Sequence, residues 1–449
     1  MRWELPGIMY CCGARRTSMS IRKAASIVVI LDGLWMACLN LASIQLNPAL
    51  ENANMSASSF TVDQIEERFG FRPNNQQIDA INSVVDWYRG WCDRAHRRQV
   101  YRLAGFAGTG KTSIAKIIAE LCCSMDWTVF VAPTGKAAAR LREKGCTNAR
   151  TLHSFIYRPI GEDEDGEIMF ANKDSLDEKP KLVVLDESSM IGEWDEERLL
   201  SHRIPVLEIG DFGQVPPVRG VQIFHENSCD TIMTEIERNA GNIVRASMFV
   251  RQGKRLPCRE YDDILVRAGF DMSDDEMRTF LDDDGVILCA YNNTRRRLNA
   301  RARRILGYKG VQPEIGEKLV CTGNQHEYGI MNGEQAILLD FKPVPEGQED
   351  DDEPDEMLFA KVRIIGTNYE RWVKFNPLSF SVEEDVRLEA QKAIGGFDFG
   401  WAMTFHKSQG SEWKRVAMLE ENLPSIPYSQ LMYTGITRAI EYLLFLRKS

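Results

Sequence analysis

The sequence lacks C-x-x-C spacing, although 11 cysteines occur among its 449 residues. Structural zinc sites commonly use that spacing, so we do not expect a zinc-stabilised module. The cysteine count is odd and the residues are scattered, which fits reduced thiols in a cytosol better than a disulfide framework. The sequence therefore does not indicate a small, cross-linked secreted protein.

An excess of positive charge is also missing. The 55 basic residues are outnumbered by 65 acidic residues, which gives a net charge of −10. This balance argues against a generally basic, histone-like nucleic-acid binder, but it leaves room for a local basic groove. With 44% hydrophobic and 27% charged residues, the composition is globular rather than collagen-like, mucin-like or disordered. The length corresponds to roughly three domains of about 150 residues.

The most apolar segment, residues 27–46, is not an uninterrupted membrane span. Three polar residues break it: Asp32, Asn40 and Gln45. Four basic residues lie shortly before it: Arg15, Arg16, Arg22 and Lys23. Basic-then-apolar order resembles a signal anchor. Residues 1–54 can also be a soluble extension or a dispensable stretch upstream of Met55, and we expect no function at a membrane.

Strands and helices alternate through most of the chain, which predicts an α/β fold with parallel sheets covered on both faces. In the first half, strands are predicted at residues 100–103, 127–132, 181–185 and 204–209, with helices at 77–88, 113–123 and 136–145. In the second half, strands are predicted at 286–290, 415–419 and 442–446, with helices at 294–306 and 429–439. We therefore expect two α/β domains.

Two insertions interrupt this alternation. Apolar stretches at residues 318–321, 335–340, 357–365 and 371–375 read as strands of a small β-barrel-like insertion. Acidic turn residues between short apolar runs predict a β-hairpin at about 156–178. The expected domain limits are 55–240 for the first α/β domain, 241–310 and 385–449 for the second, and 311–384 for the barrel-like insertion.

Residues 105–112 spell G-F-A-G-T-G-K-T, the G-x-x-x-x-G-K-[ST] phosphate-loop pattern. Its glycines allow the backbone N–H groups to approach phosphate oxygens closely. The candidate nucleotide-binding residues of this loop are Gly105, Gly108, Thr109, Gly110, Lys111 and Thr112. Lys111 supplies a positive charge to the β- and γ-phosphates, and Thr112 supplies a hydroxyl to Mg²⁺. A strand precedes the loop and a helix follows it, as this motif requires.

A second motif places two carboxylates at the end of a buried strand. Residues 182–185 are apolar and lead directly into Asp186 and Glu187. Asp186 is then positioned beside the metal, and Glu187 can act as the base for an attacking water. Together, the phosphate loop and these carboxylates predict metal-assisted hydrolysis of a nucleoside triphosphate.

The chain from about residue 69 to its end resembles the superfamily 1 DNA helicases, in the 5′→3′ branch that includes phage Dda and the RecD-like enzymes. The motifs that carry this resemblance occur in the family order: QIDAI (77–81), the phosphate loop, APTGKAAARL (132–141), TLHS (151–154), DESSM (186–190), GDFGQVPPV (210–218), TEIERN (234–239), TFHKSQGSEW (404–413) and YTGITRA (433–439). Val215 stands where the family usually has leucine. The resemblance implies two RecA-like domains.

The resemblance also assigns roles around the nucleotide. It implies that Gln77 reads adenine and that Gln214 senses the γ-phosphate, unless Gln214 is a buried structural amide. Arg238 and Arg438 correspond to arginine fingers, which stabilise charge on the transferring phosphoryl group; surface salt bridges are the alternative. Gly410 and Glu412 lie where the family contacts the nucleotide, and Glu412 could accept from the ribose or be a plain helix-start charge.

Nucleic-acid contacts are implied on both domains. The candidates are Thr134, Lys136, Thr151 and His153 in the first domain, and Asn292, Thr404, His406 and Lys407 in the second. Such side chains hold phosphates without reading bases. Phe170 in the hairpin would stack at the fork or be a core side chain. Six arginines of the helix at 294–306 would add positive field or form a solvated face.

The sequence thus predicts an ATP- and Mg²⁺-dependent DNA helicase. We expect it to act in the cytoplasm of a bacterial or phage-infected cell and not at a membrane. Its expected substrates are single-stranded DNA and fork DNA, with 5′→3′ movement inherited from the resemblance. Single-strand binding or replication and recombination proteins are expected partners of a monomer. The alternatives are a translocase without unwinding, an RNA-directed motor and a non-catalytic DNA-binding module.

Overall fold

The computed structural model describes residues 59–448, except 163–167, 177–178, 218–219, 237–240, 326–327, 345–356 and 367–368. The fold below belongs to the unit Phe60–Ser449. In the described part of the chain, none of the helices has both the length and the apolar character needed to cross a bilayer. The predictions for residues 1–54 lie outside the described residues.

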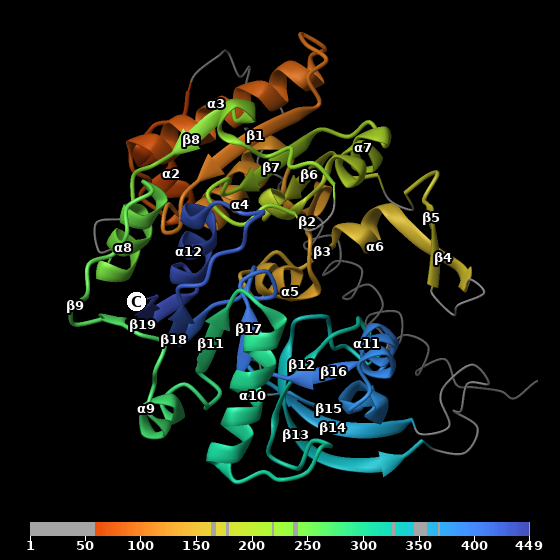
Figure 1. Cartoon of the computed structure of the whole chain (residues 1–449). Helices are drawn as coiled ribbons and strands as arrows, with labels where there is room; N and C mark the ends of the chain where they lie inside the picture. Colours follow the sequence, from red (N-terminus) through yellow and green to blue (C-terminus); the bar gives the residue numbers. More distant parts are fainter. Residues whose placement is uncertain are drawn as a thin grey trace, which may run out of the picture. The chain divides into compact units, whose positions relative to one another are not determined.

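The first α/β domain is built on a parallel six-stranded sheet (Figure 1). In spatial order its strands are β3 (Arg150–Thr151), β2 (Thr128–Ala132), β6 (Leu182–Leu185), β7 (Val206–Gly210), β1 (Val100–Gly105) and β8 (Thr231–Met233). All residues of β6 and β7 are buried, as expected for central strands covered on both faces. The predicted strands in this half are confirmed, and β3 and β8 are additional edge strands.

Helices cover both faces of this sheet: α2 (Val62–Phe69), α3 (Asn75–Cys92), α4 (Lys111–Cys122), α5 (Gly135–Glu143), α6 (Leu152–Ile156) and α7 (Glu193–Ser201). The helix predicted at residues 77–88 lies within α3, and its apolar residues are buried, with Ile81 and Val84 packed in one core with Leu103 of β1. The sequence prediction missed α2, which begins with a capping box between Thr61 and Gln64.

The predicted hairpin is present as a separate two-stranded antiparallel sheet, β4 (Tyr157–Glu162) with β5 (Ile168–Asn172). Its register shifts between Pro159 and Gly161, and Phe170 is the backbone partner of Pro159. The side chain of Phe170 lies outside the described residues, so its stacking role stays a prediction.

The second α/β domain contains another six-stranded sheet: β17 (Ala402–Thr404), β11 (Gly285–Cys289), β18 (Trp413–Leu419), β19 (Ala439–Arg447), β10 (Ile264–Ala268) and β9 (Arg259–Glu260). Only β9 runs antiparallel to its neighbour. Its helices are α8 (Asn242–Arg251), α9 (Asp274–Arg278), α10 (Asn292–Leu306) and α12 (Tyr428–Ile436). The predicted α/β fold is therefore confirmed in both halves.

The barrel-like insertion is a five-stranded antiparallel sheet: β15 (Glu370–Phe375), β14 (Leu358–Ile364), β13 (Gln335–Pro343), β12 (Lys318–Cys321) and β16 (Phe397–Phe399). Strands β15 and β16 are at opposite ends of the strand order, yet the rings of Phe375 on β15 and Phe397 on β16 lie 5.6 Å apart. The sheet is therefore curled. Helix α11 (Glu384–Lys392) precedes β16. Since β16 lies beyond residue 384, the sheet includes residues outside the predicted limits of the insertion.

The arginines of α10 require a correction. Four of the six form ion pairs: Arg295–Asp398, Arg296–Glu384 (2.7 Å), Arg301–Asp274 (2.6 Å) and Arg303–Glu317 (2.6 Å). Arg295 and Arg303 are buried, so they anchor α10 to the insertion rather than face solvent. The expectation that the whole helix supplies positive field is therefore wrong, and only Arg297 and Arg304 among the six are exposed.

Candidate nucleotide site and nucleic-acid contacts

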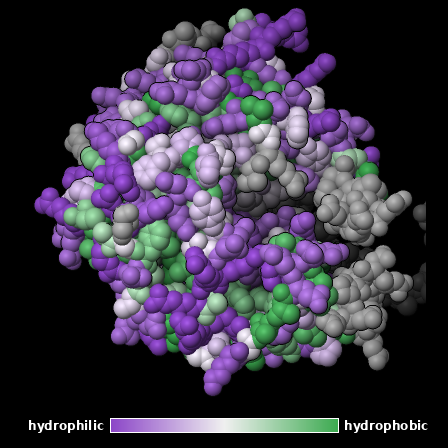
Figure 2. Space-filling view, in the orientation of Figure 1, coloured by the Kyte–Doolittle hydropathy of each residue, from purple (hydrophilic) through white to green (hydrophobic). Residues whose placement is uncertain are grey.

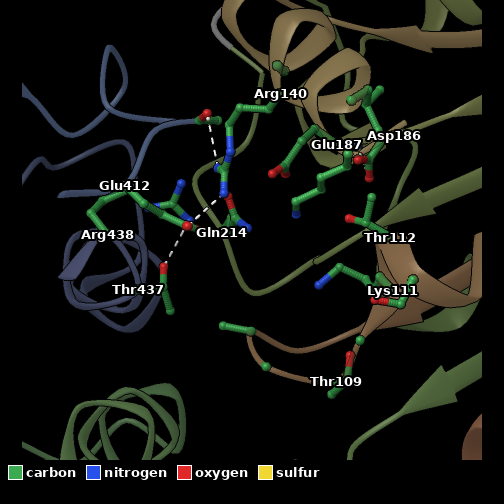
Figure 3. Close-up of a pocket in the computed structure, with 18 residues that line it drawn as sticks. Thr109, Lys111, Thr112, Arg140, Asp186, Glu187, Gln214, Glu412, Thr437 and Arg438 are labelled. Carbon is green, nitrogen blue, oxygen red and sulfur yellow. Dashed lines mark hydrogen bonds and ion pairs between the residues drawn. The ribbon is translucent and has the colours of Figure 1, made fainter. Parts of the chain in front are cut away.

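A single pocket gathers residues from both α/β domains. It is lined by Ala107, Gly108, Thr109, Gly110, Lys111, Thr112, Ser113, Ala137, Arg140, Leu141, Lys144, Asp186, Glu187, Gln214, Gly410, Glu412, Thr437 and Arg438. Figure 3 shows Lys111, Thr112 and Asp186 on one side of the pocket, facing Glu412, Thr437 and Arg438 on the other. Segments more than 300 residues apart in the sequence therefore meet around one cavity.

The phosphate loop depends on its glycines. A Cβ on Gly105 would lie 2.6 Å from Oγ1 of Thr109 and 2.9 Å from Cγ of Lys111, so a larger residue would displace the loop. Gly108 and Gly110 adopt positive φ angles of 80° and 76°, where glycine avoids the strain of a side chain. Gly110 is also the N-cap of α4, so the first N–H groups of that helix point toward the pocket.

Lys111 and Gln77 are both held by the phosphate loop itself. The Lys111 ammonium donates to the carbonyls of Gly105 (2.7 Å) and Phe106 (3.1 Å). Gln77 is buried and donates through Nε2 to the carbonyl of Thr109 (3.0 Å). Gln77 supports the loop from α3 and does not line the pocket, so its contact with adenine stays a prediction.

The two carboxylates differ in their environments. Burial, followed by the charge of the neighbouring Glu187, raises the pKa of Asp186 to about 6, while Lys111 acts in the opposite direction. A buried carboxylate of this kind gains from a nearby cation. Glu187 has a left-handed backbone with φ of 55°, a conformation that costs a non-glycine residue energy and often marks functional sites.

Gln214 and Arg438 complete the pocket from two different directions. Gln214 is buried, and among the described residues no donor meets its side-chain Oε1. Arg438 is also buried; its guanidinium donates to the carbonyls of Thr434 and Ser411 and to the hydroxyl of Thr437, each at 3.0 Å. These bonds aim Arg438 into the pocket, and a surface salt bridge is not its role in this structure.

Arg140 joins the two sides of the pocket. Its guanidinium lies 2.6 Å from the Glu412 carboxylate and 3.3 Å from the carbonyl of Gly410. Burial would raise the pKa of Glu412, but Arg140 and Arg438 lower it below its usual value. Glu412 lies just before β18 rather than at a helix start, so the helix-start alternative is wrong.

Sequence reasoning did not single out several pocket residues, among them Arg140, Lys144 and Thr437. Arg140 lies inside the motif at 132–141, one helical turn after Lys136. Its position in that motif could have identified it as a candidate site residue. Thr437 precedes Arg438 directly, and the same proximity could have identified it. Arg238 lies outside the described residues, and its role as an arginine finger stays a prediction.

The nucleic-acid candidates of the first domain have clear structural roles. Thr134 and Thr151 are N-caps, and their hydroxyls accept from the N–H groups of Ala137 and Ser154. Lys136 lies 4.9 Å above the Trp413 ring. Burial, with Arg140 next, lowers the pKa of Lys136 to about 8. Lys136 therefore packs against the second domain in this structure, which the sequence did not indicate.

His153 is the exposed candidate of the first domain. Its ring lies 4.5 Å from the ring of Tyr157, the first residue of the hairpin. Tyr157 is partly buried, and its hydroxyl donates to Asp195 (3.1 Å), so of this ring pair only His153 is exposed and its contact with nucleic acid stays a prediction.

The candidates of the second domain cluster near β17 and the start of α10. Thr404 is buried, and its hydroxyl accepts from the N–H of Lys407 (3.3 Å). Burial lowers the pKa values of both His406 and Lys407, so His406 is neutral at pH 7. Asn292 is exposed at the first turn of α10.

The surface visible in Figure 2 is mostly hydrophilic, and apolar residues gather there only in small patches. Apolar patches of limited size are usual on the surface of a folded protein. It offers no broad apolar area on the face that the figure shows.

Comparisons with known proteins agree with this site. Residues 92–261 match the family described as an AAA domain, and residues 399–446 match the UvrD-like helicase C-terminal domain. The first match contains the phosphate loop and the two carboxylates; the second contains Gly410, Glu412 and Arg438.

Two curated relatives are helicases by name. The chain is 30% identical over 412 residues to the ATP-dependent DNA helicase dda of Enterobacteria phage T4, covering 74% of this chain and 91% of the relative. It is 28% identical over 382 residues to the ATP-dependent RecD2 DNA helicase of Deinococcus radiodurans, covering 80% of this chain. The chain spans 47% of the length of that second relative.

The fold also resembles solved structures. A structure described as two coordinating Pif1 helicases at forked double-stranded DNA superposes with a TM-score of 0.51 and 16% identity, covering 83% of this chain and 91% of that chain. A Bacteroides Pif1 structure bound to single-stranded DNA gives a TM-score of 0.50 and 15% identity, with coverages of 83% and 91%. These matches support an architecture of two RecA-like domains.

Proposed function

The chain belongs to the superfamily 1B DNA helicases, the family of the phage Dda and RecD-like enzymes, and on that premise we propose that it is an ATP-driven DNA helicase. The observation that carries the proposal is the composition of the pocket. Lys111 and Glu187 from the first domain share it with Arg438 from the second, so it holds the groups needed to bind, attack and stabilise a triphosphate.

The residues around the pocket fit a nucleotide and Mg²⁺. The glycine cradle at Gly105 leaves no room for a side chain, and Asp186 is a buried carboxylate with a raised pKa. Asp186 and Thr112 would hold Mg²⁺, which would offset the negative charge of the phosphates. Lys111 would exchange its bonds to loop carbonyls for phosphate oxygens.

Three side chains then act in hydrolysis. Glu187 accepts a proton from the attacking water. The Oε1 atom of Gln214, which has no donor among the described residues, can accept from that water and orient it. Arg438 stabilises the charge that spreads over the transferring phosphoryl group. Because Arg438 belongs to the second domain, hydrolysis depends on closure of the two domains.

Closure is also the step that can move DNA. Lys136 of the first domain contacts Trp413 of the second. Each of them belongs to a motif with candidate phosphate-binding residues, at 132–141 and at 404–413. If the two domains alternate their grip on one strand, each nucleotide cycle gives one directional step. We propose that the direction is 5′→3′, in line with the family, and that the hairpin β4–β5 separates the strands at a fork.

Two alternatives make different use of the same pocket: a translocase that does not unwind, and a motor that acts on RNA. ATP hydrolysis measured with single-stranded DNA and with RNA of equal length tests the second. The proposal expects clear stimulation by DNA, and stimulation by RNA alone would overturn it. Partners such as single-strand binding protein, action as a monomer, and a cytoplasmic setting in a bacterial or phage-infected cell belong to the same proposal.

A further inference from the structure

Tyr433 connects the phosphate loop to the second domain through its hydroxyl. Tyr433 lies on α12 and is fully buried. The backbone N–H of Ala107, in the middle of the phosphate loop, donates to the Tyr433 oxygen at 2.9 Å. The same hydroxyl donates to the carboxylate of Asp211. The hydrogen bonds therefore run in one direction, from the loop amide to the hydroxyl and from the hydroxyl to the carboxylate.

Asp211 is itself fixed by several partners. Its carboxylate accepts from the N–H of Gly213 (2.9 Å) and from the guanidinium of Arg251 on α8 (3.1 Å). Asp211 is fully buried. Its carbonyl accepts from the N–H of Gln214 (3.0 Å), a residue that lines the nucleotide pocket.

Arg251 closes the cluster from the other side. Its guanidinium carbon lies 3.5 Å from the centre of the Phe106 ring and 4.5 Å from that of Phe212. Phe106 directly precedes Ala107 in the phosphate loop. Two adjacent loop residues therefore contact side chains of the helices α8 and α12: Phe106 contacts Arg251, and Ala107 contacts Tyr433. Burial and then Asp211 hold the pKa of Tyr433 well above its usual value, which keeps the hydroxyl protonated as a donor.

We propose that Tyr433 is a positioning residue that couples the phosphate loop to the movement of the second domain, through the Ala107 N–H and the Asp211 carboxylate. A displacement of α12 would shift the hydroxyl and with it the loop amide. It would also disturb Asp211, which shares its backbone with the turn that carries Gln214. The inference rests on the proposed function, because it concerns the coupling of ATP hydrolysis to DNA binding.

Substitution Tyr433→Phe tests this inference, because it keeps the buried ring and removes only the hydroxyl. The affinity for a fluorescent single-stranded oligonucleotide is measured with and without a saturating non-hydrolysable ATP analogue. The ratio of the two affinities reports coupling between the sites. In the wild-type protein this ratio departs from one. In the variant it moves toward one, and DNA-stimulated ATP turnover falls roughly tenfold, as loss of a hydrogen bond to a charged group can cause.

Tyr428→Phe is the matched control. Tyr428 is the first residue of the same helix, and its hydroxyl donates to a carboxylate, that of Glu420, at 2.6 Å. It does not line the nucleotide pocket. The control removes an equivalent hydrogen bond and leaves the coupling ratio at the wild-type value.

Wild-type turnover and an unchanged ratio in Tyr433→Phe would overturn the inference. Should that variant unfold, Asp211→Asn supplies the second test, because a neutral amide is a weaker acceptor for the hydroxyl. It is also expected to move the ratio toward one, and an unchanged ratio would equally overturn the inference. Absence of ATP turnover in the wild-type protein would instead contradict the proposed function, which separates the two failures.

Discussion

The guanidinium of Arg140 lies 2.6 Å from the carboxylate of Glu412, and this pair bridges the two α/β domains at the edge of the nucleotide pocket. Arg140 belongs to α5 of the first domain, whereas Glu412 directly precedes β18 of the second. Both side chains are partly exposed, at 29% and 39%, so the pair contributes at most about 1 kcal/mol. Such a bridge can break and re-form during a domain movement without a large barrier.

Replacing Lys111 by alanine should abolish ATP turnover. Lys111 is the one lysine in the phosphate-loop motif at 105–112. Loss of a group that stabilises the transition state lowers turnover by roughly 100-fold or more. Steady-state phosphate release with saturating single-stranded DNA measures the effect. Lys116→Ala on the same helix is the control. Lys116 donates to the Lys144 carbonyl at the surface and does not line the pocket, so this variant should keep turnover near the wild-type rate. Full DNA-stimulated turnover in Lys111→Ala would contradict the assignment of the site.

Replacing Arg438 by lysine should lower the maximal rate of hydrolysis much more than nucleotide affinity. Lysine keeps the charge but cannot reproduce the planar fork of the guanidinium, and an arginine finger is worth on the order of 10³-fold in turnover. Turnover and the affinity for a fluorescent ADP are the two measurements. Arg304→Lys, at an exposed position of α10, is the control. A large loss of ADP affinity with an unchanged maximal rate would argue against the finger role.

Replacing Phe170 by alanine should reduce unwinding while ATP hydrolysis continues. Phe170 lies on β5 of the hairpin, away from the segments that line the pocket. Base–aromatic stacking is worth about 1–3 kcal/mol, so we expect unwinding to slow by roughly tenfold or more. Phe270→Ala, at a 38% exposed position outside the hairpin, is the control. Equal unwinding by Phe170→Ala and the wild type would remove this residue from the mechanism.

The free energy of unfolding should decrease as the pH rises from about 4.5 to 8. Glu208 is fully buried on β7, and burial, followed by the charge of Glu196, raises its pKa to about 8. Within that window the folded protein holds a proton that the unfolded chain has lost. Stability therefore falls with rising pH by up to about 1.4 kcal/mol per pH unit. Urea unfolding at several pH values measures this slope.

Glu208→Gln should flatten that dependence, because the amide does not titrate. Arg102 then keeps Glu196 as its partner. The control is Glu197→Gln, at an exposed position of α7, which should retain the wild-type slope. An identical slope in Glu208→Gln and the wild type would show that another group is responsible.

Much of the nucleotide site could be predicted from sequence because its parts lie in contiguous motifs. The glycines, Lys111 and Thr112 occur within eight residues, and Asp186 and Glu187 follow a wholly apolar strand. In such motifs the residues that shape the backbone and the residues that bind the ligand lie in one short segment, so the sequence of that segment is enough to predict both. The parallel sheets were equally accessible, because their buried strands are short apolar runs.

Contacts between distant segments could not be predicted in the same way. Nothing near Tyr433 in the sequence indicates that its hydroxyl meets Ala107, 326 residues away. The arginines of α10 looked like a basic face, but their carboxylate partners, such as Asp398 and Glu384, are supplied by other segments. Short elements were also missed. One of them is β10, which has five residues and whose alternation of buried and exposed residues breaks down at its end.

The central claim, that this chain is a helicase that moves 5′→3′, is tested most directly by unwinding of two DNA substrates that differ only in the polarity of their single-stranded tail. Each duplex carries a fluorophore and a quencher, and strand release is followed after addition of ATP and Mg²⁺. The account predicts ATP-dependent release from the substrate with the 5′ tail and little from the one with the 3′ tail. Release only from the 3′-tailed substrate, or from neither while ATP is hydrolysed, would contradict it.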